Sequence, residues 1–139
     1  MFRLSSPPDD LLASWDGEAS DPRTVMCLVS LILLLNPKMV FESGTYKGHF
    51  ALLAAWTMKQ NEFPGHIWPA DIEDGGVEER LRDHELGKYV TVYHGSYDDM
   101  IREVIRPVNF AYVDATDRSD PSLRLRHVEQ TMNLMAPGG

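Results

Sequence analysis

The stretch that decides the fold of this chain is MVFESGTYKG, residues 39–48. It begins with three apolar residues, passes through the acid Glu42, and contains two glycines, Gly44 and Gly48, four positions apart. The mainly apolar residues 49–60 that follow have the length of a helix. A strand, a tight glycine turn and a helix in this order are typical of a βα unit in a parallel sheet.

Strands and helices alternate along the rest of the chain. The sequence predicts strands at 39–41, 66–70, 89–93 and 108–113, and helices at 22–35, 49–60, 77–86, 97–105 and 121–135. Gly87 is expected to end the helix 77–86 in a left-handed conformation. Pro69 is unusual inside a strand, because proline cannot donate to the ladder. The alternation predicts an α/β fold with a parallel sheet and right-handed crossovers.

The helix 22–35 is apolar on all sides from residue 25 onward, which predicts that it packs between other elements. Cys27, the single cysteine, is expected to be buried there. The apolar run is shorter than the roughly 20 residues of a membrane span, and residues 1–10 lack the features of a secretory signal. We therefore expect a soluble, cytoplasmic protein, with an arm at 1–20 and one domain at 21–139.

The charge of the chain limits its partners. A formal net charge of -8 disfavours a nucleic-acid backbone or an anionic membrane as the main partner. The densest basic stretch, residues 118–126, is interrupted by Asp120 and is interpreted as a solvated helix face.

Acids and glycines follow the predicted strands. They occur in four clusters, at 42–48, 71–73, 95–97 and 114. In a parallel sheet, ligands bind beyond the carboxyl ends of the strands, where the strand order reverses. The four clusters are therefore expected to converge on one crevice.

The first of these turns does not fit a dinucleotide. It lacks the G-x-G-x-x-G pattern, and Glu42 at the strand end would repel a pyrophosphate but attract a cationic ligand. The sequence Glu42-Ser43-Gly44-Thr45-Tyr46-Lys47-Gly48 resembles the first motif of class I S-adenosylmethionine-dependent methyltransferases, acid-x-Gly-x-x-x-Gly. It is most similar to the form Glu-x-Gly-Thr-x-x-Gly of small-molecule O-methyltransferases. An ordinary strand-to-helix turn is the alternative.

The resemblance covers residues 21–139 and implies a Rossmann-like sheet in the order 3-2-1-4, with helices on both faces. Strands 5–7 of such a domain have no counterpart in this sequence. Two explanations stay open: a fragment or truncated form of a longer enzyme, or a four-stranded domain whose exposed edge is covered by a partner chain or a second copy.

The resemblance also implies a set of cofactor-binding residues. The backbone of residues 43–46 and the Glu42 side chain would lie beside the methionine portion of S-adenosylmethionine. Asp71 would accept hydrogen bonds from the ribose hydroxyls, with Glu73 as the second choice. Asp98 would accept from the adenine amine. The complete set is Glu42, Ser43, Gly44, Thr45, Tyr46, Gly48, Asp71, Ile72, Glu73, Gly95, Ser96, Tyr97 and Asp114.

Asp114 ends the predicted fourth strand, where metal-dependent members of the family carry an aspartate that binds a divalent cation. It is the candidate residue for acting on the methyl acceptor and a candidate metal ligand, with Asp117 as a second. One carboxylate does not make a magnesium site, so the sequence does not support a metal.

The function that follows is methyl transfer from S-adenosylmethionine, with O-methylation of a small molecule as the expected reaction. The alternative is a non-catalytic, methyltransferase-like module that binds a nucleoside ligand or a partner subunit.

Overall fold

A four-stranded parallel sheet forms the centre of the molecule. The computed structural model describes residues 2–3, 6–12, 21–73, 75–104, 107–115 and 119–135. The strands are β1 (Met39–Ser43), β2 (His66–Asp71), β3 (Tyr93–His94) and β4 (Phe110–Val113). Their order is β3-β2-β1-β4, and every neighbouring pair is parallel. The predicted order 3-2-1-4 is confirmed.

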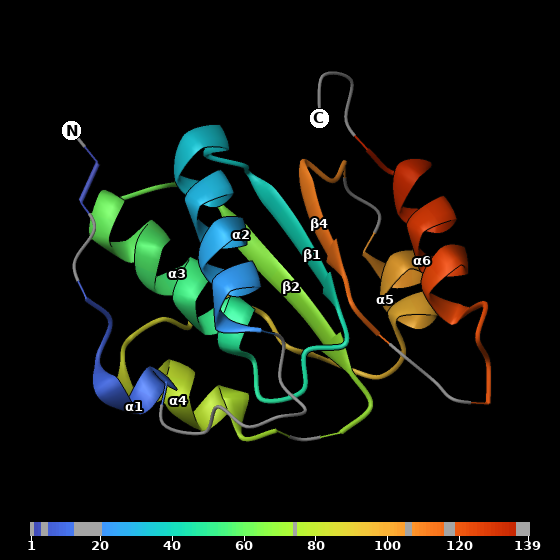
Figure 1. Ribbon diagram of the computed structural model, residues 1–139, viewed down its shortest axis with the longest axis horizontal. Helices are drawn as coiled ribbons and strands as arrows, with labels where there is room; N and C mark the ends of the chain where they lie inside the picture. The colour runs from blue at the N-terminus through green and yellow to red at the C-terminus, as the bar shows by residue number, and fades with distance from the viewer. Residues whose placement is uncertain are drawn as a thin grey trace.

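Helices cover both faces of this sheet, as predicted (Figure 1). They are α1 (Asp9–Leu12), α2 (Pro22–Leu35), α3 (His49–Asn61), α4 (Val77–Asp83), α5 (Tyr97–Glu103) and α6 (Leu123–Met132). Helices α2 and α3 lie together on one face, and α5 and α6 lie together on the other (Figure 1).

The alternation of side chains along β1 divides the core in two. Val40 joins the cluster beneath α2 and α3, whereas Met39 and Phe41 join the cluster beneath α5 and α6. Because successive side chains of a strand point to opposite faces, a strand buried on both faces is apolar at every core position. This placement leaves Glu42 and Ser43, the last residues of β1, at the carboxyl edge of the sheet.

Helix α2 does not pack between other elements, and the expectation that it does is wrong. Only its inner face is buried, through Val25, Val29, Ile32 and Leu33. Cys27 is exposed, contrary to the prediction, and Leu34 on the outer face is 70% exposed. An all-apolar sequence does not show how many sides of a helix are covered, because that depends on the neighbouring elements.

Pro69 explains why β3 is shorter than the predicted strand 89–93. The backbone of Ile67 bonds to Tyr89 and Thr91, and the Asp71 carbonyl accepts from Gly95 N, so the odd-numbered residues of β2 face β3. Pro69 faces the same side but has no N–H to donate. The ladder is therefore interrupted after a single bridge at Val90, and β3 resumes only at Tyr93.

The helix predicted at 77–86 ends at Asp83, and its left-handed residue is Glu85 (φ 55°) rather than Gly87. Leu86 is fully buried, and its N–H donates to the Leu81 carbonyl at 2.7 Å. Placing Leu86 in the core requires the chain to leave the helix before it reaches the glycine.

Two further elements begin later than predicted. Strand β4 begins at Phe110 rather than at residue 108. The side-chain oxygen of Asn109 accepts the hydrogen bond from Met39 N that a backbone carbonyl would accept in a regular strand. Helix α6 begins at Leu123, because the Asp120 carboxylate accepts from both the N–H and the hydroxyl of Ser122 and holds a turn there. Along the outer edge of β4, the described residues pair only through the bridge Val108–Met135. Coverage of this edge by another chain stays a prediction.

The segment predicted as an N-terminal arm contains α1, and the side chain of Leu11 in this helix is fully buried in the core. The Asp10 carboxylate and Nε2 of His84 form a hydrogen bond of 2.6 Å, which joins α1 to the end of α4. Among the described residues, no helix has both the length and the apolar character needed to cross a membrane.

Candidate functional site

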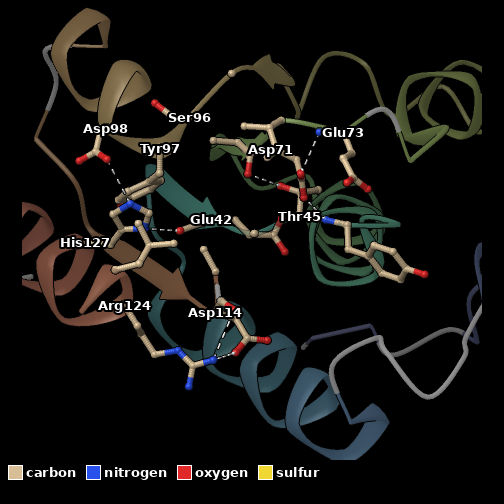
Figure 2. Close-up of a pocket in the computed structure, with 18 of the residues that line it drawn as sticks. Glu42, Thr45, Asp71, Glu73, Ser96, Tyr97, Asp98, Asp114, Arg124 and His127 are labelled. Atoms are coloured by element: carbon tan, nitrogen blue, oxygen red, sulfur yellow. Dashed lines mark hydrogen bonds and ion pairs between the residues drawn. The ribbon is translucent and has the colours of Figure 1, made fainter. Parts of the chain in front are cut away.

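The carboxyl ends of all four strands meet at one cavity of about 930 Å³, as predicted. Every residue expected to bind the cofactor lines it except Gly48. Figure 2 shows Asp71, Thr45 and Glu73 on one side of the cavity, Tyr97, Asp98 and His127 on the other, and Glu42 between them. Residues from β1, β2, the start of α5 and the start of α6 therefore share one space.

The turn after β1 depends on the glycine at position 44. Gly44 has φ +82°, and a Cβ there would lie 2.7 Å from the Cα of Ala115. L-residues rarely adopt this backbone conformation, and a contact with backbone atoms cannot be relieved by rotating a side chain. The loop after β1 and the loop after β4 consequently approach each other more closely than any other residue type would allow.

Asp71 organises the same turn from the end of β2. Its carboxylate accepts hydrogen bonds from Tyr46 N and from Glu73 N, so both oxygens already have a backbone donor. An ionised carboxylate can accept about four hydrogen bonds, so each oxygen can take another from a ligand. The side chain is thereby fixed in orientation and still competent to bind.

Gly48 lies outside the cavity and is required for helix packing instead. It adopts φ +74°, and a Cβ there would lie 2.7 Å from Cγ2 of Val77. This glycine allows α3 to begin close to α4. The motif thus contains one glycine at the cavity and one for helix packing.

Glu42 is the most unusual residue of the cavity. Its side chain comes from the end of β1, the residue is 2% exposed, and Oε2 has no hydrogen-bond partner among the described residues. Burial raises its pKa well above the ordinary value, and the charges of Asp71 and Asp114 raise it further, whereas a hydrogen bond from Thr45 acts in the opposite direction. Among the described residues, no cation compensates this carboxyl group at the floor of the cavity.

Asp114 lies in the cavity at the end of β4, where both of its oxygens are engaged. Oδ1 is 3.0 Å from the Arg124 guanidinium, and Oδ2 accepts from the Tyr112 hydroxyl at 2.9 Å. Figure 2 shows Arg124 reaching from α6 to Asp114. Arg124 is the only lysine or arginine among the described residues that line the cavity.

These residues do not fit a divalent cation. Within the described ranges, no three histidine, cysteine, aspartate or glutamate side chains form a group that could hold a metal ion. A guanidinium already pairs with Asp114, and a cation is a poor neighbour for a second one. Asp117, the other candidate ligand, lies outside the described residues.

The side chains at the start of α5 are already engaged. The Ser96 hydroxyl accepts from Asp99 N and caps the helix, and the Tyr97 hydroxyl lies 2.6 Å from the Thr131 hydroxyl. The pKa of Tyr97 rises to about 12, chiefly because of burial. Asp98 accepts from Gln130 through Oδ1 and points its other oxygen toward His127. Of these three, Asp98 has the oxygen best placed to accept from a ligand.

Sequence reasoning missed Arg124 and His127. The stretch 118–126 was interpreted as a solvated face, but Arg124 pairs with Asp114, and Arg126 pairs with Asp98 and Asp120. Arg118 lies outside the described residues. Arg124 and His127 are three positions apart on α6, so they share the helix face toward the cavity. The position of α6 directly after β4, which leads to Asp114, could have indicated that one face of this helix lies toward the cavity.

Comparison with known proteins assigns this chain to a family. Residues 41–139, more than half of the chain, match a family model described as a methyltransferase domain. No curated protein matches the chain. The chain therefore belongs to the methyltransferase domain family, and its fold is that of the class I S-adenosylmethionine-dependent enzymes.

Solved structures share this fold. An O-methyltransferase from Bacillus cereus in complex with S-adenosylhomocysteine aligns with a TM-score of 0.73 and 17% identity, covering 93% of this chain and 61% of that one. The O-methyltransferase TomG from Streptomyces achromogenes in complex with S-adenosylmethionine aligns with a TM-score of 0.74 and 15% identity, covering 99% and 64%. Identities this low show the fold alone. The chain thus spans less than two thirds of the length of these neighbours.

Proposed function

We propose that this protein binds S-adenosylmethionine in the cavity at the strand ends and transfers its methyl group to a small-molecule oxygen acceptor. The observation that carries the proposal is Glu42, a buried carboxyl with an unpartnered oxygen at the floor of the cavity. An unpaired buried polar group is costly, so it is retained where a ligand satisfies it. S-adenosylmethionine carries an ammonium and a sulfonium and no phosphate.

The surrounding residues match the parts of this cofactor. Asp71 is held by two backbone donors and would accept hydrogen bonds from the ribose hydroxyls. Glu42 lies beside the turn at Gly44 and would pair with the amino group. Arg124, the cation of the cavity, would pair with the methionine carboxylate. Neighbours of the same fold contain S-adenosylmethionine or S-adenosylhomocysteine, which supports this assignment.

When bound, the cofactor supplies a methyl group already activated by its sulfonium. The chain contributes position: fixed carboxylates and a fixed turn hold the reactants so that transfer becomes effectively unimolecular. Asp114 would lie nearest the acceptor and would orient it through the oxygens now bonded to Arg124 and Tyr112.

The proposal is tested by titrating the whole chain with S-adenosylhomocysteine, S-adenosylmethionine and NAD in a calorimeter, followed by methylation assays on a panel of phenols and catechols. We expect the two sulfur nucleosides to bind and NAD not to bind. Binding without methylation of any acceptor would favour the non-catalytic module. Failure of both sulfur nucleosides to bind would refute the proposal.

Asp71→Ala is expected to weaken S-adenosylhomocysteine binding by about 1–3 kcal/mol, because the ribose hydroxyls lose their acceptor and the turn at Tyr46 loses its anchor. The measurement is calorimetry beside Glu73→Ala, which removes the neighbouring exposed acid, and Asp83→Ala, which lies at the end of α4 outside the cavity. A larger loss in Glu73→Ala than in Asp71→Ala would reverse the assignment of the ribose acid.

Arg124→Gln is expected to weaken S-adenosylhomocysteine binding by about 1 kcal/mol, a modest value because the side chain is 51% exposed. Methylthioadenosine lacks the amino acid portion, so its affinity should not change. Calorimetry with both ligands distinguishes the loss of the carboxylate contact from a general weakening of the site. Equal losses for both ligands would show that Arg124 does not contact the carboxylate.

A further inference from the structure

The turn after β1 contains a strained residue that is not glycine. Tyr46 adopts φ +49°, a left-handed conformation that is unfavourable for a residue with a Cβ. Such a conformation persists where the surrounding structure holds it in place. The first half of the turn is tied to the end of β2, because the N–H groups of Gly44 and Thr45 donate to the Ala70 carbonyl. The second half, residues 46–47, is held by other groups.

Two charged side chains hold this second half, one before and one after the loop 72–76 that follows β2. The Asp71 carboxylate accepts from Tyr46 N, and the Arg80 guanidinium of α4 donates to the Lys47 carbonyl. Helix α4 lies beside the start of α3, so its side chains can reach the turn (Figure 1). The strained turn is thus bonded on both sides by groups from the β2–α4 connection.

Arg80 also bonds to the loop 72–76 itself. Its Nη2 donates to the Gly75 carbonyl at 3.0 Å, and its Nε donates to the Gly76 carbonyl at 3.4 Å. A planar guanidinium has five N–H donors in a fixed arrangement, so one side chain can bond to carbonyls of two segments at once. Burial lowers the pKa of Arg80, and these bonds compensate the charged group for the water that it loses.

The loop and the turn that Arg80 joins are in direct backbone contact. A Cβ at Gly75 would overlap the carbonyl oxygen of Tyr46, so only glycine allows the two segments to approach this closely. Tyr46 in the turn and Asp71 and Glu73 at the start of the loop line the cavity, whereas Arg80 lies outside the set of described residues that line it. The contact that Arg80 holds therefore sets the spacing of two walls of the cavity.

A bound sulfur nucleoside would span both segments, with its amino acid portion beside the turn and its ribose at Asp71. We propose that Arg80 is a positioning residue that fixes the spacing of the two segments and so sets the affinity for the complete cofactor. A site already held in its bound geometry does not have to be ordered when the ligand binds, which raises the affinity. This inference rests on the proposed function and adds to it a residue that acts from outside the cavity.

The test compares calorimetric titrations of the whole chain with S-adenosylhomocysteine, which spans both segments, and methylthioadenosine, which lacks the amino acid portion. In Arg80→Gln, the affinity for S-adenosylhomocysteine should fall by about tenfold, whereas that for methylthioadenosine should fall by about twofold or less. Arg80→Lys keeps the charge but not the planar fork, so it should show a smaller loss of the same kind. Arg82→Gln, the same change at an exposed position of α4, is the control and should bind both ligands like the wild type.

The ratio of the two affinities is the decisive quantity. If Arg80 only stabilised the fold, its loss would lower the folded fraction and weaken both ligands by the same factor. Gly75→Ala tests the same contact from the loop, even if Arg80→Gln does not fold, and should change the ratio in the same direction. An unchanged ratio in Arg80→Gln or in Gly75→Ala would overturn the inference and leave the proposed cofactor site intact, whereas a wild type that binds neither ligand would refute the proposed function itself.

Discussion

Replacing Glu42 with glutamine is expected to make the protein more stable at pH 7 and a weaker binder of S-adenosylmethionine. Glutamine keeps the shape of the side chain but removes a carboxyl that is buried and repelled by Asp71 and Asp114. The free energy of unfolding should rise by roughly 1–3 kcal/mol at neutral pH.

The gain in stability should depend on pH. Because the pKa of Glu42 is raised on folding, its neutral form contributes stability that is complete below the unfolded pKa of about 4.3 and is lost as pH rises through the folded pKa. The glutamine variant has no such loss. Its advantage should be small near pH 4.5 and large near pH 7.5, as measured by urea denaturation beside the exposed control Glu79→Gln.

The affinity of Glu42→Gln for S-adenosylmethionine should decrease, although its stability increases. A cationic ligand requires the ionised carboxylate, so the variant should lose about 2–4 kcal/mol of affinity for S-adenosylmethionine. In the wild type, affinity should fall as pH decreases below the raised pKa, and binding should release a proton. Calorimetry in buffers with different ionisation enthalpies detects this release, which should be absent from Glu42→Gln. A variant that is less stable and binds normally would contradict the role of Glu42.

Substitution of Gly44 is also expected to have a large effect on stability, and a comparison of three glycines distinguishes backbone strain from steric contact as its cause. Gly87 has an ordinary backbone and open space, so Gly87→Ala should be neutral or slightly stabilising. Gly76 has φ +70° and open space, so Gly76→Ala should cost about 1 kcal/mol from backbone strain alone. Gly44→Ala adds the contact with the Ala115 backbone and should cost about 2–5 kcal/mol.

Urea denaturation of the three variants measures their free energies of unfolding. Calorimetry measures their affinity for S-adenosylhomocysteine. Gly44→Ala must push apart the loops after β1 and β4, so it should weaken binding, whereas Gly87→Ala should not. Similar costs in Gly44→Ala and Gly76→Ala would show that the two loops can separate without penalty.

The sheet and most of the cavity were predictable because they follow from local sequence patterns. Apolar runs ending in acids identified the strands, and the parallel topology then required those ends to meet, so Glu42, Asp71 and Asp114 were found together. The element ends were less predictable. Asn109, Leu86 and the Asp120–Ser122 turn changed them through contacts that no local pattern encodes.

The sequence by itself predicted the parallel α/β sheet, the position of the cavity and the acids that surround it, because each depends on residues near one another in the chain. The strand order came from the resemblance of the turn after the first strand to a known family. Only the tertiary structure decided that α2 leaves Cys27 and Leu34 uncovered, that Gly48 packs against α4, and that Arg124 and His127 reach the cavity. The reason is that burial and partner choice depend on which elements lie side by side. Ser43 and His127 are 84 positions apart and meet only when α6 packs on the sheet.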